Sequence, residues 1–206
     1  MAASAAQENP FVAFAERYFD DIPGFAREVL GIEMDEWQAI VAAWVSQGER
    51  AISIRSGHGV GKSTCLAIIA VHALCTRAPV KIVMTAPSQP HLFDALFAKT
   101  RAMVEKLPAA LRDMIETKAE RIVHKGAPDE VFISARTSRA ENPEALQGVH
   151  SEWVYLFADE ASGVPDAVFE AAAGSMSGHR AVTILTGNPT RTSGFFYDTH
   201  TKLAHR

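Results

Sequence analysis

The sequence has few cysteines and no long apolar run. Cys65 and Cys75 are the only cysteines among 206 residues, which is too few for a disulfide framework or a zinc site. No apolar segment approaches the roughly 20 residues that a membrane helix needs. Met1 to Pro10 lacks the basic stretch and apolar segment of a secretion signal. We therefore expect a soluble protein of a reducing, cytoplasmic compartment, without membrane contact.

An excess of basic charge is also absent. Lys and Arg number 20 against 24 Asp and Glu, giving a formal net charge of −4. This balance argues against a protein that coats nucleic acid by charge alone, but it leaves room for a local basic groove. Hydrophobic residues make up 48% of the chain, too many for a disordered protein. At about 150 residues per domain, the length corresponds to about one domain.

The N-terminal part of the chain predicts helices. Residues 1–10 are expected to be a flexible tail and 11–206 one folded domain. Asn9-Pro10 has the form of a helix start, and Pro23-Gly24 is expected to break that helix before a short second one. A third helix is predicted from about 35 to 47. Its residues Trp37, Ile40, Val41 and Trp44 recur at helical spacing, which favours a core-facing stripe.

From about residue 50 onward, short apolar runs alternate with helical patterns. Strands are predicted at 51–55, 80–85, 153–158 and 181–186, helices at 62–76, 89–106 and 165–175, and an alternating pair at 120–124 and 130–135. Strands that alternate with crossover helices indicate an α/β fold with a mainly parallel central sheet flanked by helices.

A glycine-rich segment between a predicted strand and a predicted helix is typical of a phosphate-binding loop, or P-loop. It comprises Ser56, Gly57, His58, Gly59, Val60, Gly61, Lys62, Ser63 and Thr64. Backbone N–H groups of such a loop point at phosphate oxygens, Lys62 can bridge the β- and γ-phosphates of ATP, and Ser63 can coordinate Mg²⁺. The usual pattern begins with glycine, where this chain has Ser56. The alternative is a glycine-rich turn without a ligand.

A second polar segment follows the apolar run 153–158. Asp159 and Glu160 stand where the strand should end, at the edge at which open α/β sheets bind ligands. Asp159 is expected to hold Mg²⁺, and Glu160 to deprotonate the attacking water. The alternative is an acidic helix cap. A base beside the metal ligand indicates a P-loop NTPase of the additional-strand, catalytic-glutamate type. Its extra strand would be 181–186, so that Gly187, Asn188 and Pro189 reach the γ-phosphate.

Several segments together resemble the large terminase subunit of tailed bacteriophages, over roughly residues 35–200. They are Trp37-Gln38, Ala86-Pro87-Ser88, the stretch 146–150, the stretch 153–162, and the stretch 186–198 with its Thr-Gly-Asn-Pro motif. The resemblance implies an N-terminal DNA-packaging ATPase followed by a nuclease domain. This chain would contain only the ATPase, so we expect the nuclease and the last part of the ATPase domain to be absent.

The resemblance also implies roles for particular residues. Gln38 would contact adenine, and Asn188 would sense the γ-phosphate. Some members of the family place an arginine inside the phosphate loop, at the position of His58 here. An arginine from a neighbouring subunit is therefore expected to stabilise the phosphoryl group, with Arg139 as the first candidate and Arg136 as the second. Both arginines are equally compatible with solvated loop positions.

The function that follows is Mg²⁺-dependent hydrolysis of ATP that drives double-stranded DNA into a capsid. The resemblance implies assembly into a ring on the portal, a small terminase subunit as partner, and a phage or prophage protein in the host cytoplasm. Two other functions remain open: a helicase-like or other DNA-remodelling ATPase, and a nucleotide-binding fragment without turnover. A small-molecule kinase is less consistent with Glu160, because a carboxylate base favours water as nucleophile.

Overall fold

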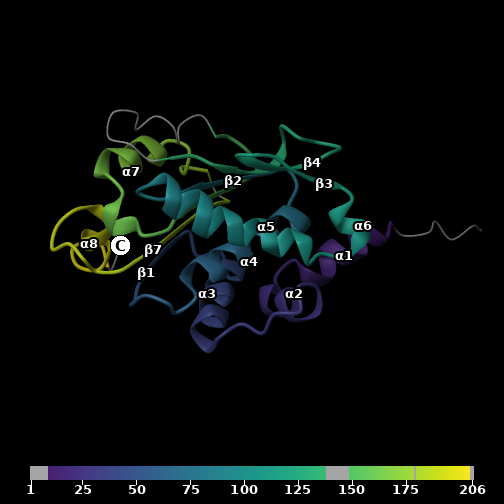
Figure 1. The fold of residues 1–206 in the computed structure, drawn as a ribbon, viewed down its shortest axis with the longest axis horizontal. Helices are drawn as coiled ribbons and strands as arrows, with labels where there is room; N and C mark the ends of the chain where they lie inside the picture. The colour runs from purple at the N-terminus through teal and green to yellow at the C-terminus, as the bar shows by residue number, and fades with distance from the viewer. Residues whose placement is uncertain (1–8, 138–148, 179, 205–206) are drawn as a thin grey trace, which may run out of the picture.

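The computed structural model describes residues 9–137, 149–178 and 180–204 (Figure 1). In chain order the elements are α1 (Pro10–Tyr18), α2 (Ile22–Glu28), α3 (Glu36–Ser46), β1 (Ala51–Arg55), α4 (Lys62–Thr76), β2 (Val80–Thr85), the π-helix η1 (Pro90–Phe97), α5 (Ala98–Glu105), α6 (Ala109–Arg112), β3 (Ile115–Thr117), β4 (Arg121–His124), β5 (Val131–Ala135), β6 (Trp153–Ala158), the 3-10 helix η3 (Ala161–Gly163), α7 (Asp166–Ala173), β7 (Ala181–Gly187) and α8 (Phe195–Thr199). The predicted α/β class is confirmed.

The strands of the described residues form one sheet in the order β1-β7-β6-β2-β5-β4-β3. Neighbours from β1 to β5 run parallel, whereas β4 is antiparallel to β5 and β3 antiparallel to β4. The predicted position of the additional strand is confirmed, because β7 lies between β1 and β6. This order brings the ends of β1, β7 and β6 to one edge of the sheet, where the loops that follow them can meet.

Helices cover both faces of the sheet. Tyr155 and Phe157 of β6 pack into a core with α1 to α5, while Val154 and Leu156 pack into a second core with α7 and Phe196 of α8. Figure 1 accordingly shows α1, α2 and α3 beside α4, apart from α7. A strand buried on both faces is apolar at almost every position, which explains the unbroken run 153–158. No helix of the described residues is long and apolar enough to span a membrane.

One expectation for the N-terminal helices is confirmed and another is wrong. The helix start at Asn9-Pro10 is confirmed, because Pro10 is the first residue of α1 and the Asn9 side chain accepts from the N–H of Phe11. Pro23-Gly24 does not break a helix: it lies in the first turn of α2, where Asp21 caps the backbone N–H of Gly24. Proline is tolerated in a first turn because its nitrogen would have no helical partner there. The break instead falls between Tyr18 and Ile22.

The predicted apolar stripe of α3 is wrong for half of its members. Ile40 and Trp44 are 45% and 43% exposed, whereas Val41, Val45 and Gln38 are buried. The buried face of α3 is therefore rotated from the stripe that aromatic and aliphatic spacing suggests. This rotation places the polar Gln38 inside the molecule, against the start of α4.

His72 joins α4 to the N-terminal helices and provides a test of this packing. Its Nε2 lies 2.7 Å from the carbonyl oxygen of Tyr18, and its ring packs edge-on against Phe25. Nε2–H therefore donates to that carbonyl. Burial lowers the pKa of His72 from 6.5 to about 3. Below pH 6.5 the unfolded chain binds a proton that the folded chain does not, so this residue makes the free energy of unfolding fall as pH falls from about 6.5 to about 3.

Below pH 6.5, the free energy of unfolding contributed by His72 falls by about 1.4 kcal/mol per pH unit. Between pH 7 and pH 5 we therefore expect the wild type to lose about 2 kcal/mol more stability than His72→Gln. Glutamine can donate to the Tyr18 carbonyl but does not titrate in this range. Urea denaturation of both proteins at the two pH values measures the difference. Equal losses in the two proteins would mean that His72 titrates normally and is not packed as described.

Candidate functional site

The segment between β1 and α4 has the backbone of a phosphate-binding loop. Gly59 and Gly61 have φ of 77° and 87°, a left-handed conformation that L side chains rarely adopt. A Cβ at Gly61 would in addition lie 2.7 Å from Nε2 of Gln38. The loop leads into α4 at Lys62, so the unpaired N–H groups of the first helical turn lie beside it. Such a loop and helix start form an anion site.

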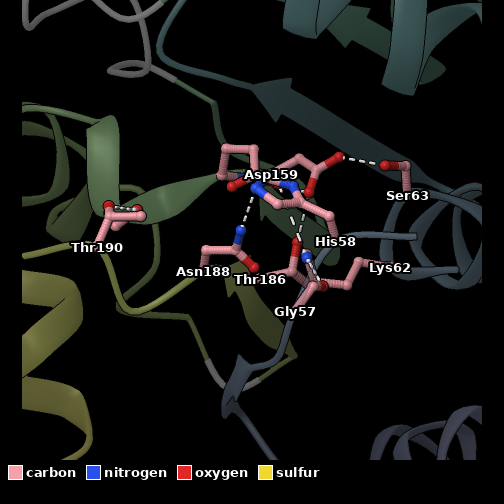
Figure 2. Close-up of polar contacts among 10 residues, drawn as sticks. Gly57, His58, Lys62, Ser63, Asp159, Thr186, Asn188 and Thr190 are labelled. Carbon is pink, nitrogen blue, oxygen red and sulfur yellow. Dashed lines mark hydrogen bonds and ion pairs between the residues drawn. The ribbon is translucent and has the colours of Figure 1, made fainter. Parts of the chain in front are cut away.

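Lys62 is buried at the base of this loop. Its Nζ donates to the carbonyl oxygen of Gly57 at 2.7 Å and lies 3.7 Å from Oε1 of Glu160 (Figure 2 shows the first contact). The lysine side chain is 5% exposed and that of Glu160 24%. A cation held this way is available to phosphate oxygens, which are stronger acceptors than a peptide carbonyl.

Asp159 follows β6 and accepts three hydrogen bonds. Ser63 Oγ donates to Oδ2 at 2.5 Å, Thr186 Oγ1 donates to Oδ1 at 2.7 Å, and the backbone N–H of Glu160 donates to Oδ1 at 3.1 Å. Figure 2 shows the carboxylate between Ser63 and Thr186. The adjacent hydroxyl and carboxylate oxygens are the hard donors that Mg²⁺ requires, so this pair fits the metal.

The part of Thr186 in this arrangement was missed by the sequence reasoning. Thr186 is on β7, and β7 pairs with β6 so that Ala158 lies opposite Leu185. The next residues on the two strands, Asp159 and Thr186, therefore lie side by side. The sequence offered one signal for this contact: Thr186 is a polar residue at the end of the predicted strand 181–186, which was expected to lie beside the strand before Asp159.

The backbone of Glu160 differs from that of the residues around it. Its φ is 49°, the only positive value at a non-glycine residue among the described positions. This left-handed conformation is unfavourable for a side chain such as glutamate, and residues held in it are enriched at active sites and ligand-binding loops. It turns the chain sharply after Asp159, so that the two neighbouring carboxylates point to different partners. Asp159 contacts Ser63, and Glu160 contacts Lys62.

Asn188 stands opposite the phosphate loop. β1 and β7 pair with Arg55 opposite Gly187, and the N–H of Ser56 donates to the carbonyl of Gly187 at 3.1 Å. Asn188 is 8% exposed. Its Nδ2 lies 2.5 Å from Nε2 of His58, a contact drawn in Figure 2.

Three buried polar atoms near these residues have no hydrogen-bond partner in the described part of the chain. They are the hydroxyls of Ser56 and Thr85 and the side-chain carbonyl of Asn188. Ser56 follows β1, Thr85 ends β2 and Asn188 follows β7. Buried polar groups normally have partners, so their collection at one edge of the sheet indicates a place for a ligand or for water.

The remaining predicted site residues are Gln38 and two candidate arginines. Gln38 accepts from the N–H of Asp35 at 3.0 Å and donates to the carbonyl of Gly61 at 3.2 Å, so it links the start of α3 to the phosphate loop. Arg139 lies outside the described residues. Arg136 follows β5, and both burial and the nearby Arg121 lower its pKa. The structure thus brings together 56–64, Asp159, Glu160 and Asn188, with Gln38 touching the loop.

The chain has a strand (β1), a glycine-rich loop and a helix (α4) in succession. An acidic residue follows β6, and the additional strand β7 lies between β1 and β6. This arrangement defines the P-loop nucleotide-binding class. A family profile described as "Terminase large subunit, T4likevirus-type, N-terminal" matches residues 54–204, and the chain belongs to this family. A probable terminase large subunit of Enterobacteria phage P7 is 32% identical over 160 residues, which is 75% of this chain and 32% of that protein. The chain thus spans about a third of the length of this relative.

Solved structures support the same fold. The large terminase ATPase domain of Thermus phage P74-26 matches with a TM-score of 0.61 and 21% identity, covering 84% of this chain and 71% of that one. A large terminase from a thermophilic bacteriophage, solved in complex with ADP, matches with a TM-score of 0.59 and 16% identity. That match covers 76% of this chain and 39% of the other. The P-loop fold predicted from the sequence is therefore confirmed.

Proposed function

We propose that this chain is a Mg²⁺-dependent ATPase domain that hydrolyses ATP to drive double-stranded DNA into a phage capsid. The observation that carries the proposal is the convergence of Lys62, Ser63, Asp159 and Glu160 from two separate segments. Membership in the terminase family supports DNA packaging as the work to which hydrolysis is coupled. The ADP complex of a structural relative supports a nucleotide as the ligand.

Each residue of the site has a chemical task in this reaction. Lys62 moves from the Gly57 carbonyl to oxygens of the β- and γ-phosphates. Ser63 and Asp159 would hold Mg²⁺, which would neutralise part of the phosphate charge. Glu160 accepts a proton from the attacking water as the oxygen of that water bonds to the γ-phosphorus. The bond between that phosphorus and the β–γ bridging oxygen breaks, and ADP leaves with the electron pair.

The remaining site residues complete the proposal. Asn188, which follows β7, is proposed to sense the γ-phosphate, and Gln38 is proposed to contact adenine from α3. Arg139, supplied by a neighbouring subunit, is proposed to stabilise the transferring phosphoryl group, which gives a reason for ring assembly. The portal, a small terminase subunit and the host cytoplasm are the partners and location that fit a packaging ATPase.

The test is phosphate release by the chain with ATP and Mg²⁺, with EDTA, and with double- or single-stranded DNA added. We expect hydrolysis that EDTA abolishes and that double-stranded DNA stimulates more than single-stranded DNA. Stronger stimulation by single strands, together with strand separation, would instead identify a helicase-like enzyme. Nucleotide binding without any phosphate release would identify a binding module.

A further inference from the structure

The contact between His58 and Asn188 joins the phosphate loop to the end of β7. Position 58 lies three residues beyond Arg55 and Asn188 lies one residue beyond Gly187, the pair at which the strands separate. The side chains then meet across the gap, with Asn188 Nδ2 and His58 Nε2 within hydrogen-bond distance. Figure 2 shows the imidazole and the amide pointing toward one another.

The chemistry of the two groups fixes which one donates. The Asn188 amide nitrogen has two N–H donors and no acceptor, so the facing Nε2 of His58 must accept, with the ring proton on Nδ1. One N–H of Asn188 is thereby held by the imidazole. The other is free to point elsewhere, and the amide carbonyl is buried without a partner among the described residues.

In the tautomer with the proton on Nδ1, Nε2 of His58 accepts from Nδ2 of Asn188 and so holds the amide nitrogen, rather than the carbonyl, toward the loop. With the nitrogen toward the loop, the second N–H can donate to a phosphate oxygen. With the amide turned over, the carbonyl would face that oxygen, and two acceptors repel each other. The orientation of the Asn188 amide therefore depends on its hydrogen bond with His58.

We propose that His58 is a positioning residue that orients the Asn188 amide and so sets how strongly the site prefers ATP to ADP. The inference rests on the proposed function, in which Asn188 faces the γ-phosphate. ADP lacks that group, so only ATP binding depends on the orientation of the amide. His58 acts here through Asn188, with no proton transfer to or from the substrate.

The experiment measures the affinity of the chain for ADP and for a non-hydrolysable ATP analogue, both with Mg²⁺. His58→Leu removes the acceptor but keeps a similar volume, and His58→Gln restores an acceptor. A hydrogen bond to a charged group contributes about 10- to 100-fold in affinity. We therefore expect the ratio of affinities for the analogue and for ADP to fall at least about tenfold in His58→Leu. ADP affinity should fall much less than affinity for the analogue, and His58→Gln should retain most of the preference.

A double-mutant cycle separates positioning from an independent contact. If His58 acts through Asn188, Asn188→Ala alone and His58→Leu/Asn188→Ala together lose the same preference. His91→Ala, at an exposed histidine of η1, serves as the matched control and should behave as the wild type. Losses that multiply in the double variant, an unchanged preference in His58→Leu, or equal losses for ADP and the analogue would each overturn the inference.

Failure of the proposed function has a different signature. In that case Lys62→Ala would bind the ATP analogue as tightly as the wild type does. If Lys62→Ala abolishes binding while His58→Leu keeps the full preference, the nucleotide site stands and only the positioning role is lost.

Discussion

Replacing Glu160 with glutamine is expected to lower ATP turnover by about 10²- to 10⁴-fold, the usual contribution of a general base. Glutamine has nearly the same shape as glutamate but cannot accept the proton from the attacking water. The substitution also removes the negative partner that lies 3.7 Å from Lys62 Nζ. Lys62 is then free to contact phosphate, so ATP should bind at least as tightly as in the wild type.

Two measurements separate these effects. Single-turnover hydrolysis reports the chemical step, and equilibrium binding of ATP to the slow variant reports affinity. Glu170→Gln provides the control, because Glu170 is an exposed glutamate on α7, the helix that follows Glu160 in the sequence. Hydrolysis by Glu160→Gln at the wild-type rate would assign the base to another residue. Loss of binding together with turnover would show that Glu160 supports the fold of the site.

The sequence predicted three strands and the helix after the phosphate loop with their observed bounds. Ala51–Arg55, Lys62–Thr76, Val80–Thr85 and Trp153–Ala158 are bounded by glycine, proline or charged residues and filled with apolar ones. Such segments are defined locally, because composition and punctuation agree. The three-residue strand Ile115–Thr117 has no such signal. It was not predicted, since it exists through its pairing with Arg121–His124.

The face of α3 could not be predicted from the helix alone. Spacing identifies a stripe of apolar residues, but the neighbouring elements decide which stripe is covered. Here the capping interaction of Gln38 with Asp35 and its bond to Gly61 turn a polar residue inward, and Trp44 remains half-exposed. A glutamine three residues after a capping aspartate is a recognisable local signal, but its contact with the phosphate loop depends on tertiary structure.

The candidate site likewise combines features recognisable in the sequence with contacts that only the tertiary structure determines. The phosphate loop and the Asp159-Glu160 pair were recognisable because their residue types and order reflect their chemistry. The contacts of Thr186 with Asp159 and of His58 with Asn188 depend on the registers of β7 with β6 and with β1. Registers are fixed by packing over the whole sheet, so a sequence motif does not contain them.

Replacing Lys62 with alanine is expected to weaken ATP binding by about 10²- to 10³-fold and to abolish measurable hydrolysis. Removing one member of a buried charge pair costs about 2–5 kcal/mol, and about 1.4 kcal/mol corresponds to a tenfold change in affinity. In this site the loss acts twice. The phosphates lose the cation at the base of the loop, and Glu160 is left without its positive partner beside the negatively charged nucleotide.

Affinity for ATP and for ADP, measured beside the melting temperature of each variant, distinguishes a damaged site from an unfolded chain. Lys99→Ala removes an exposed lysine from α5 and controls for the change in net charge. Lys62→Arg keeps the charge but replaces a compact ammonium by a planar fork, so it should recover binding only in part. If Lys62→Ala bound ATP normally, the phosphates could not lie in the loop formed by residues 56–61. The roles of Ser63, Asp159 and Glu160 would then fall with it, because all three are defined by their distance from that position.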